Sequence, residues 1–323
     1  MDYVRYWSDR AEVTAKQILS WANVYQGTYH DWCKRYGKVN EHNGWIPRDH
    51  WLEAWEKEAI IAFYTEQCQS EGYRRVTYMM LDQDIVAASP SSVYRVLSAA
   101  GLLGVRPPRS TMKGKGFQQP SHPHRDWHID ISFLNICGTF YHFIGILDGF
   151  SRKILHWDIR ERGTEWDVEM VVQRCRETYP NANPRIISDN GPQFVAKEFK
   201  QFVRLCGMTH VRTSPYYPQS NGKLERFHRS YKEECIRPGT PLTLDDARRI
   251  TADYVTQYND QRLHGAIGYI TPTDKFVGRA EQIHAERDRK LEAARARRAE
   301  RRRSCHATDV GGCTTPDHVG VGA

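Results

Sequence analysis

The pattern of apolar and polar positions changes after about residue 120 of this 323-residue chain. Residues 127–133 alternate between the two kinds, which places Ile129 and Ile131 on one face of a predicted strand and Asp130 on the other. Two more strands follow, and then strands alternate with segments of helical periodicity. This order predicts an α/β fold in which helices cover a mixed sheet.

Capping residues and short apolar runs define the elements of this part. Thr164 is followed three residues later by Asp167, a signature that opens a helix. The turn sequence Asp189–Pro192 ends a short apolar run, which predicts a strand before it. The expected strands are 127–133, 141–147, 153–159, 185–188 and 209–213, and the expected helices are 164–179, 196–206 and 224–235.

Before residue 104 the periodicity is helical and predicts two small units, 1–55 and 56–103. In the first, a break near Gln26 and a restart at Thr28 give the outline of a helix-turn-helix, whose second helix can enter the major groove of DNA. In the second, the expected helices are 56–68, 72–81 and one that begins at Ser89-Pro90. Helix pairs are common, so a packing role stays open beside DNA binding for both units.

Three further segments complete the organisation of the chain. Residues 104–121 are rich in proline, glycine and basic residues, which predicts a linker that lies on something anionic. Residues 122–278 form the α/β core, and 279–323 form a basic, partly disordered tail. Within this tail, Arg295–Arg303 fits either a helical arm that contacts DNA or a frayed, solvated terminus, and we expect disorder after Ser304.

Composition and charge narrow the class of protein. The chain is 40% hydrophobic and 26% charged, which is typical of a globular protein and excludes wholesale disorder. Its apolar runs are far shorter than the ~18–20 residues that a membrane span needs, and its N-terminus lacks the apolar region of a secretory signal. We therefore expect a cytoplasmic protein with no membrane partner. The net charge of +7 is compatible with a nucleic-acid partner but does not demand one.

Eight cysteines are scattered along the chain with no C-x-x-C pair, which fits reduced thiols better than a disulfide framework. Near the C-terminus, Cys305, His306, Cys313 and His318 could supply four ligands to a metal ion. Their spacing matches no common zinc pattern, so we expect disorder there instead.

Three carboxylates occupy positions where a structural role would be unusual. Asp130 lies inside a predicted strand, where Asp is disfavoured, Asp189 ends another strand, and Glu225 begins a helix. A buried aspartate with two further acids nearby is costly unless a partner compensates its charge. Divalent cations supply such a partner, and Mg²⁺ prefers oxygen ligands. Two such ions can activate a nucleophile and stabilise the leaving oxygen in a displacement at phosphorus.

Basic residues continue the helix that Glu225 begins. Arg229 and Lys232 follow at i+4 and i+7 and share its face, and Arg226 lies nearby. Taken alone, Glu225 and Arg229 fit an ordinary ion pair on a solvated face. Beside two matching aspartates, the pattern instead favours contact of the basic residues with phosphates. Asn190, in the turn after the second aspartate, fits a DNA contact or an Asx turn equally well.

Several longer motifs carry a family resemblance. They are Trp127-His-Ile-Asp130, Ile187-Ser-Asp-Asn-Gly-Pro-Gln-Phe194, Ser214-Pro-Tyr-Tyr-Pro-Gln-Ser-Asn-Gly-Lys-Leu-Glu-Arg-Phe227, Tyr258-Asn-Asp-Gln-Arg-Leu-His264 and Thr271-Pro272. The stretch from about Asp126 to Val277 that contains them resembles the DDE integrase core shared by retroviral integrases and bacterial insertion-sequence transposases. Leu263 stands where the bacterial branch usually has proline. The helical segments Gly72–Arg75 and Ser89–Val96 are similar to the region ahead of that core.

The resemblance implies an RNase H-like core in which Asp130, Asp189 and Glu225 are catalytic and bind two Mg²⁺ or Mn²⁺ ions. It implies a DNA transposase: water hydrolyses a strand at the end of a mobile element, and the exposed 3′-OH attacks target DNA. The partners would be double-stranded DNA and at least one more copy of the chain, because two ends must be joined. Expected DNA contacts are Asn190, Lys223, Arg226, Arg229 and Lys232.

Two other functions stay open. An RNase H-type nuclease shares the three carboxylates, although the long helical region and the basic helix after Glu225 favour transfer to DNA. A catalytically idle DNA-binding protein could keep the fold, although the intact acids argue against it. Of the other candidates, we expect a structural or peripheral DNA role for Asp126 and His128, a turn role for Asp148, and core positions for Trp157 and Trp166.

Overall fold

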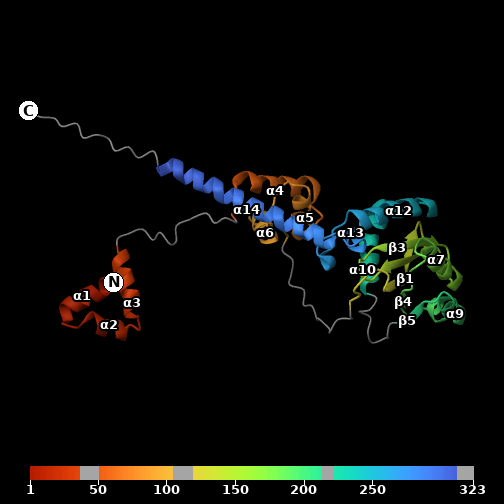
Figure 1. Cartoon of the computed structure of the whole chain (residues 1–323), viewed down its shortest axis with the longest axis horizontal. Coiled ribbons are helices and arrows are strands. Elements are labelled where there is room, and N and C mark those ends of the chain that lie inside the picture. The colour runs from red at the N-terminus through yellow and green to blue at the C-terminus, as the bar shows by residue number, and fades with distance from the viewer. Residues whose placement is uncertain (37–50, 105–118, 213–221, 311–323) are drawn as a thin grey trace, which may run out of the picture. The chain divides into compact units, whose positions relative to one another are not determined.

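The computed structural model describes residues 1–36, 51–104, 119–212 and 222–310, and the chain separates into two units, 1–49 and 50–323 (Figure 1). The first unit contains three short helices, α1 (Asp2–Ala11), α2 (Ala15–Trp21) and α3 (Gln26–Arg35), around a small apolar core. A helix, a turn and a second helix are present as predicted. The second helix starts at Gln26 rather than Thr28, because Tyr25 takes the N-cap position.

Three helices open the second unit: α4 (Ala54–Gln67), α5 (Tyr73–Asp82) and α6 (Pro90–Ala99). The start of α6 is as predicted, since the Ser92 N–H donates to Ser89 Oγ and Pro90 occupies the first turn. The three helices share one apolar core, whose fully buried members are Ile60, Val76, Met80, Val93 and Leu97.

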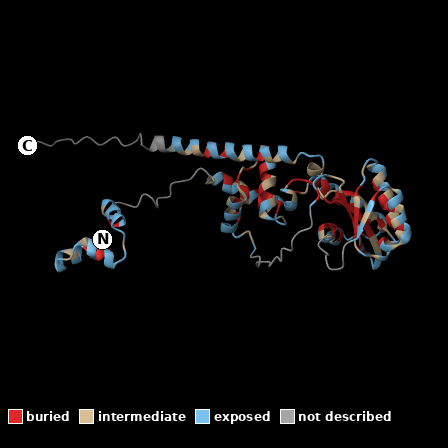
Figure 2. Cartoon of the chain, turned by 60° about the horizontal axis from the view of Figure 1, so that its bottom comes forward, coloured by how far each residue is buried: buried red, intermediate tan, exposed pale blue. Residues whose placement is uncertain are grey.

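The described chain ends in one long helix, α14 (Ala280–Val310), which lies along α4 and α5 in both views (Figures 1 and 2). Ion pairs join it to those helices. Arg298 pairs with Glu56 at 2.7 Å, with both side chains buried, and Arg287 pairs with Asp82 at 2.6 Å. The helix is therefore attached to the helical region through buried and half-buried charge pairs.

This packing corrects the expectation for the basic tail. The frayed, solvated alternative for Arg295–Arg303 is wrong, because the run is helical and acidic residues of the helical region neutralise part of its charge. The helix also continues beyond Ser304 to Val310, where disorder was expected. Cys313 and His318 lie outside the described residues.

A five-stranded sheet forms the centre of the second unit, in the order β3-β2-β1-β4-β5. The β3-β2 and β2-β1 pairs are antiparallel, and the β1-β4 and β4-β5 pairs are parallel. The strands are β1 (Asp126–Ile136), β2 (Thr139–Asp148), β3 (Ile154–Arg160), β4 (Arg185–Ser188) and β5 (Thr209–Arg212). All five occur where the sequence pattern places them, and the predicted mixed sheet is confirmed.

Helices cover both faces of this sheet, and most buried residues lie between them and the strands (Figure 2). Ile129 packs toward one face and Leu134 toward the other, as the alternation predicts. The first face carries α7 (Glu165–Thr178), α8 (Pro192–Val195) and α9 (Lys197–Leu205). The second carries α10 (Gly222–Tyr231), the π-turn η3 (Lys232–Ile236) and α12 (Leu244–Asp260). The remaining short elements are α11 (Arg237–Gly239), η4 (Gly265–Ile267) and α13 (Pro272–Phe276).

The helix predicted over 224–235 is interrupted by the π-turn η3. Pro238 follows directly in α11. Its ring would clash with the carbonyl of Glu234 in a regular α-helix, and it has no N–H to donate. The wider π-turn accommodates this proline and changes the direction of the side chains that begin at Lys232.

The two tryptophans differ in position. Trp157 packs against the core and stacks on Phe143, as expected. Trp166 is 60% exposed in the first turn of α7, so its core assignment is wrong. Within the described residues no helix is both long and apolar enough to cross a membrane.

Candidate active site

Asp130 lies in the middle of the central strand β1, opposite Gly145 of β2. Its side chain is 14% exposed and faces α10. Oδ1 accepts a hydrogen bond from the Ile131 N–H at 2.9 Å, and Oδ2 lies 3.6 Å from Nδ1 of His228. No arginine or lysine pairs with this carboxylate among the described residues, so its charge has little local compensation.

Asp189 follows β4, the parallel neighbour of β1. The register pairs Asp126 with Arg185 and His128 with Ile187. Two residues further along, the same register leads to Asp130 and Asp189, on one face of the sheet. Oδ1 of Asp189 accepts the Gly191 N–H at 2.9 Å, an Asx turn that fixes the side chain at the end of the strand.

Glu225 lies in the first turn of α10, which packs on the same face of the sheet through Leu224, Phe227 and Tyr231. His228, three residues later, lies against Asp130. Residues three apart are neighbours on a helix, so the Glu225 side chain is directed toward the same part of the sheet. It is exposed, in contrast to Asp130.

The pKa of Asp130 is affected by the charges of Asp189 and Glu225. Burial, together with the negative charges of Asp189 and Glu225, raises the pKa of Asp130 to about 7. The hydrogen bond from Ile131 and the charge of Lys232 oppose this increase. Burial is the largest cause, and Asp189 has more influence than the exposed Glu225.

His228 is a site residue that the sequence analysis missed. It is buried, and burial with the nearby charge of Lys232 lowers its pKa to about 3, so the imidazole is neutral at physiological pH. Its Nε2 has no hydrogen-bond partner among the described residues. The i, i+3 spacing from Glu225 could have identified it, because this spacing places both side chains on one helix face.

The predicted basic face of α10 is present. Glu225, His228, Arg229 and Lys232 line one cavity of about 350 Å³, together with Glu233 and Arg237. Arg226 and Arg229 are exposed, as is Asn190 in the turn after Asp189. Lys223 differs, because it is buried and its Nζ donates to the Gly149 carbonyl at 2.7 Å. Burial and the charge of Arg152 lower the pKa of Lys223 to about 8.

Two other buried aspartates near the site have partners of their own. Asp126 pairs with Arg185 at 2.6 Å. Asp148 accepts the N–H of His124 and both the N–H and the hydroxyl of Ser151, at 2.7–2.8 Å. Both residues therefore have the structural roles that the sequence analysis allowed for them.

The three carboxylates provide hard oxygen donors, which is the chemistry that Mg²⁺ and Mn²⁺ require. Burial and, to a lesser extent, the charges of Asp189 and Glu225 disfavour the ionised form of Asp130, and a bound cation would offset both. The three carboxylates do not converge on a single point: within the described residues, no group of three or more His, Cys, Asp and Glu side chains is close enough to hold a metal ion. The donor set fits a divalent cation, and completing the site requires the three carboxylates to come closer together.

Sequence profiles and related proteins both connect this chain with integrase cores and insertion elements. Two sequence profiles described as "Integrase core domain" match residues 120–218 and 206–272. An uncharacterized protein of insertion element IS476 from Xanthomonas euvesicatoria is 26% identical over 226 residues, which cover 67% of this chain and 64% of that protein. Transposase InsD of the IS2 elements from Escherichia coli is 29% identical over 224 residues, 65% of this chain and 74% of InsD. The chain thus spans slightly less than two thirds of the first relative.

Solved structures of retroviral integrases are also similar. The simian T-cell lymphotropic virus intasome, solved with a PP2A regulatory subunit, matches with 18% identity and a TM-score of 0.45 over 68% of this chain and 74% of that one. The HTLV-2 integrase catalytic core, solved with magnesium, matches with 20% identity and a TM-score of 0.37 over 48% and 98%.

Proposed function

Because this chain belongs to the DDE integrase/transposase family, in its bacterial insertion-element branch, we propose that it cleaves the ends of a mobile element and joins the freed 3′-OH to target DNA. The observation that carries the proposal is the charge around Asp130. A mid-strand carboxylate with two acidic neighbours and no basic partner among the described residues is built to receive a cation.

Asp130, Asp189 and Glu225 would hold two divalent ions, Mg²⁺ or Mn²⁺. Such ions supply an activated oxygen nucleophile and stabilisation of the leaving oxygen at phosphorus. The role of the protein is then to orient these groups, since phosphoryl transfer needs positioning and charge neutralisation more than covalent chemistry.

Other residues of the site would hold the DNA. Neutral His228 lies 3.6 Å from the Asp130 carboxylate and adds no charge beside it. Arg229 and Lys232 line the cavity beside Glu225 and would contact phosphates of the bound strand, and Asn190, in the turn after Asp189, would add a further contact. We propose that the protein acts on DNA in the bacterial cytoplasm as a dimer or larger assembly, because two element ends must be joined.

The test is strand transfer on labelled DNA that carries the element's own ends, with Mg²⁺, comparing the unmodified protein with Glu225→Gln. This change preserves size and removes one negative charge. We expect joined products from the unmodified protein and none from the variant. Glu177→Gln is the matched control, because it makes the same change on an exposed residue of α7 whose carboxylate accepts a hydrogen bond from Gln173, and it should leave joining unchanged.

Two outcomes would contradict the proposal. Cleavage of RNA–DNA hybrids without joining of DNA would indicate an RNase H-type nuclease. Binding of the DNA ends with neither cleavage nor joining, in both the unmodified protein and the control, would indicate a DNA-binding protein that retains the fold.

A further inference from the structure

A second cavity, of about 450 Å³, lies on the other side of α10 from Glu225. Its lining comes from five parts of the unit: α5, the turn after β2, α10, α12 and the segment after α12. None of the described residues that line it is acidic. Its cationic lining residues are Arg75, Arg152, Lys223, Arg226, Arg229 and Arg262.

Two of these six cations already have carboxylate partners. Arg75 pairs with Glu71, and Arg262 makes a two-fold contact with Glu234. Lys223 donates to a carbonyl, which leaves its charge uncompensated by any direct ion pair in the described chain. Cations without a partner carboxylate therefore dominate the interior of the cavity.

Three guanidinium groups have no hydrogen-bond or ion-pair partner among the described residues. They belong to Arg152, Arg226 and Arg229. Arg152 is half-buried, and burial together with the charge of Arg226 lowers its pKa. Like charges that are held close together repel one another, and an anion bound between them relieves this repulsion. Arg152 has the most to gain from such a ligand, because it is half-buried whereas Arg226 and Arg229 are exposed to solvent.

The size and the cationic lining of the cavity fit an oxyanion. A tetrahedral oxyanion presents several oxygens that can accept hydrogen bonds from guanidinium groups. The volume lies within the range of about 300–1,000 Å³ that small-ligand sites occupy, large enough for a phosphate with its attached sugar.

We propose that this cavity, defined by Arg152, Lys223 and Arg226, binds a phosphate group, and that in the working protein this group is a phosphodiester of the bound DNA. The DNA part rests on the proposed function, whereas the phosphate site does not. Because Arg75 of α5 also lines the cavity, a phosphate held there would join the helical region to the catalytic core.

The first experiment measures thermal unfolding of the full chain in sodium phosphate against sodium chloride of equal ionic strength. We expect phosphate to raise the Tm by roughly 2–4 °C at about ten times its Kd. Arg152→Gln should remove this increase, and so should Arg226→Gln, whose exposed side chain is not needed for folding. Arg249→Gln is the control, because it removes an exposed arginine that pairs with Asp246 on α12, and it should keep the increase.

The second experiment identifies the source of the phosphate. Binding of duplex DNA is followed over a salt series, in which each lost phosphate contact reduces the slope of log K against log salt by about 0.9. We expect this reduction in Arg152→Gln and Arg226→Gln and not in Arg249→Gln. The cavity variants could instead lose the Tm increase in phosphate and keep the salt dependence of DNA binding. This result would overturn the DNA assignment and leave a site for a free phosphate or phosphoester.

The site itself is overturned if phosphate has no effect beyond that of chloride, or if the cavity variants respond as the control does. These results are independent of the carboxylates. Failure of Glu225→Gln to abolish joining would contradict the proposed function and leave the thermal result standing.

Discussion

Two aspartates stand in the middle of strands of the same sheet, Asp130 in β1 and Asp158 in β3. Their side chains are almost equally buried, 14% and 13% exposed. Each also accepts a hydrogen bond from the N–H of the next residue, at 2.9 and 2.8 Å. In burial and local backbone contact they are a matched pair.

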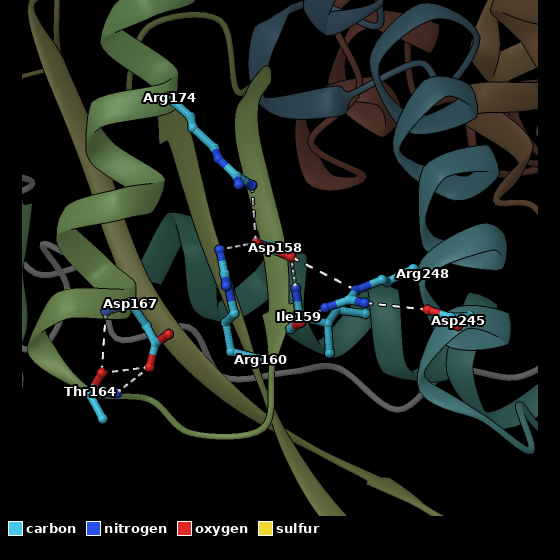
Figure 3. A network of polar contacts seen from close by, with 8 residues as sticks. All are labelled: Asp158, Ile159, Arg160, Thr164, Asp167, Arg174, Asp245 and Arg248. Atoms are coloured by element: carbon cyan, nitrogen blue, oxygen red, sulfur yellow. Dashed lines mark hydrogen bonds and ion pairs between the residues drawn. The ribbon is translucent and has the colours of Figure 1, made fainter.

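They differ in their partners. Figure 3 shows that three arginines converge on Asp158: Arg160 at 2.8 Å, Arg174 at 3.5 Å and Arg248 at 4.0 Å. Asp130 instead has a neutral histidine and two acids nearby. Three arginines of the protein supply positive charge to Asp158. Among the described residues, no arginine or lysine pairs with Asp130. A mid-strand aspartate is therefore informative about function only when its partners are known.

The largest difference between the two should appear in catalysis. We expect Asp130→Asn to reduce strand transfer by about 1,000-fold or more, because it removes a ligand charge on which phosphoryl transfer depends. Asp158→Asn makes the same chemical change at equal burial and should retain activity per folded molecule. Strand-transfer rates of the two variants at equal folded concentration measure this, and equal losses would remove the distinction between the two sites.

The next difference concerns pH in the absence of metal. The pKa of Asp130 is raised from the ordinary value of an aspartate to about 7, so between these two values the folded state holds a proton that the unfolded state has released. Stability is then full below about pH 4 and is lost as pH rises toward 7, by at most roughly 4 kcal/mol. Urea unfolding in EDTA from pH 4 to 8 should show this loss in the unmodified protein and not in Asp130→Asn. A constant difference between the two across this range would contradict the raised pKa.

Much of this architecture could be predicted from the sequence, because period-two alternation and capping residues are local signals. The five strands, the cap at Ser89 and the position of Asp130 in the middle of β1 follow from them. The charge pairs of α14 could not be predicted, since Arg298 and Glu56 are 242 positions apart. From the sequence alone, a basic helix that packs against distant acidic residues has the same pattern as a basic tail exposed to solvent.

The candidate site shows the same limit at closer range. The three acids can be identified by their motifs, yet the rule that disfavours Asp in strands applies equally to Asp158. Its three arginines come from β3, α7 and α12, and only the packed fold brings them together. Pro238 is likewise visible in the sequence, but the π-turn that it accompanies depends on how the helix packs.

A smaller difference is expected in stability at neutral pH. Asp158→Asn should reduce the free energy of unfolding by about 1–3 kcal/mol, because three arginines lose their shared carboxylate, although two of them are well exposed to solvent. Asp130→Asn should be neutral or stabilising without metal, since it removes repulsion from Asp189 and Glu225. Urea titrations at pH 7.5 in EDTA compare the two, and a larger loss in Asp130→Asn would show that its charge is compensated after all.

The smallest effect is the response to Mg²⁺ itself. A ligand that binds only the folded state stabilises it by RT ln(1 + [L]/Kd), roughly 1.4 kcal/mol at ten times the Kd. The unmodified protein and Asp158→Asn should therefore gain stability as Mg²⁺ is added at pH 7.5, and Asp130→Asn should not. Equal concentrations of Na⁺ charge serve as the control for screening. If Asp130→Asn gained as much as the other two, the cation would be binding elsewhere, and the uncompensated charge in β1 would need a different partner, such as a basic group supplied by a second copy of the chain.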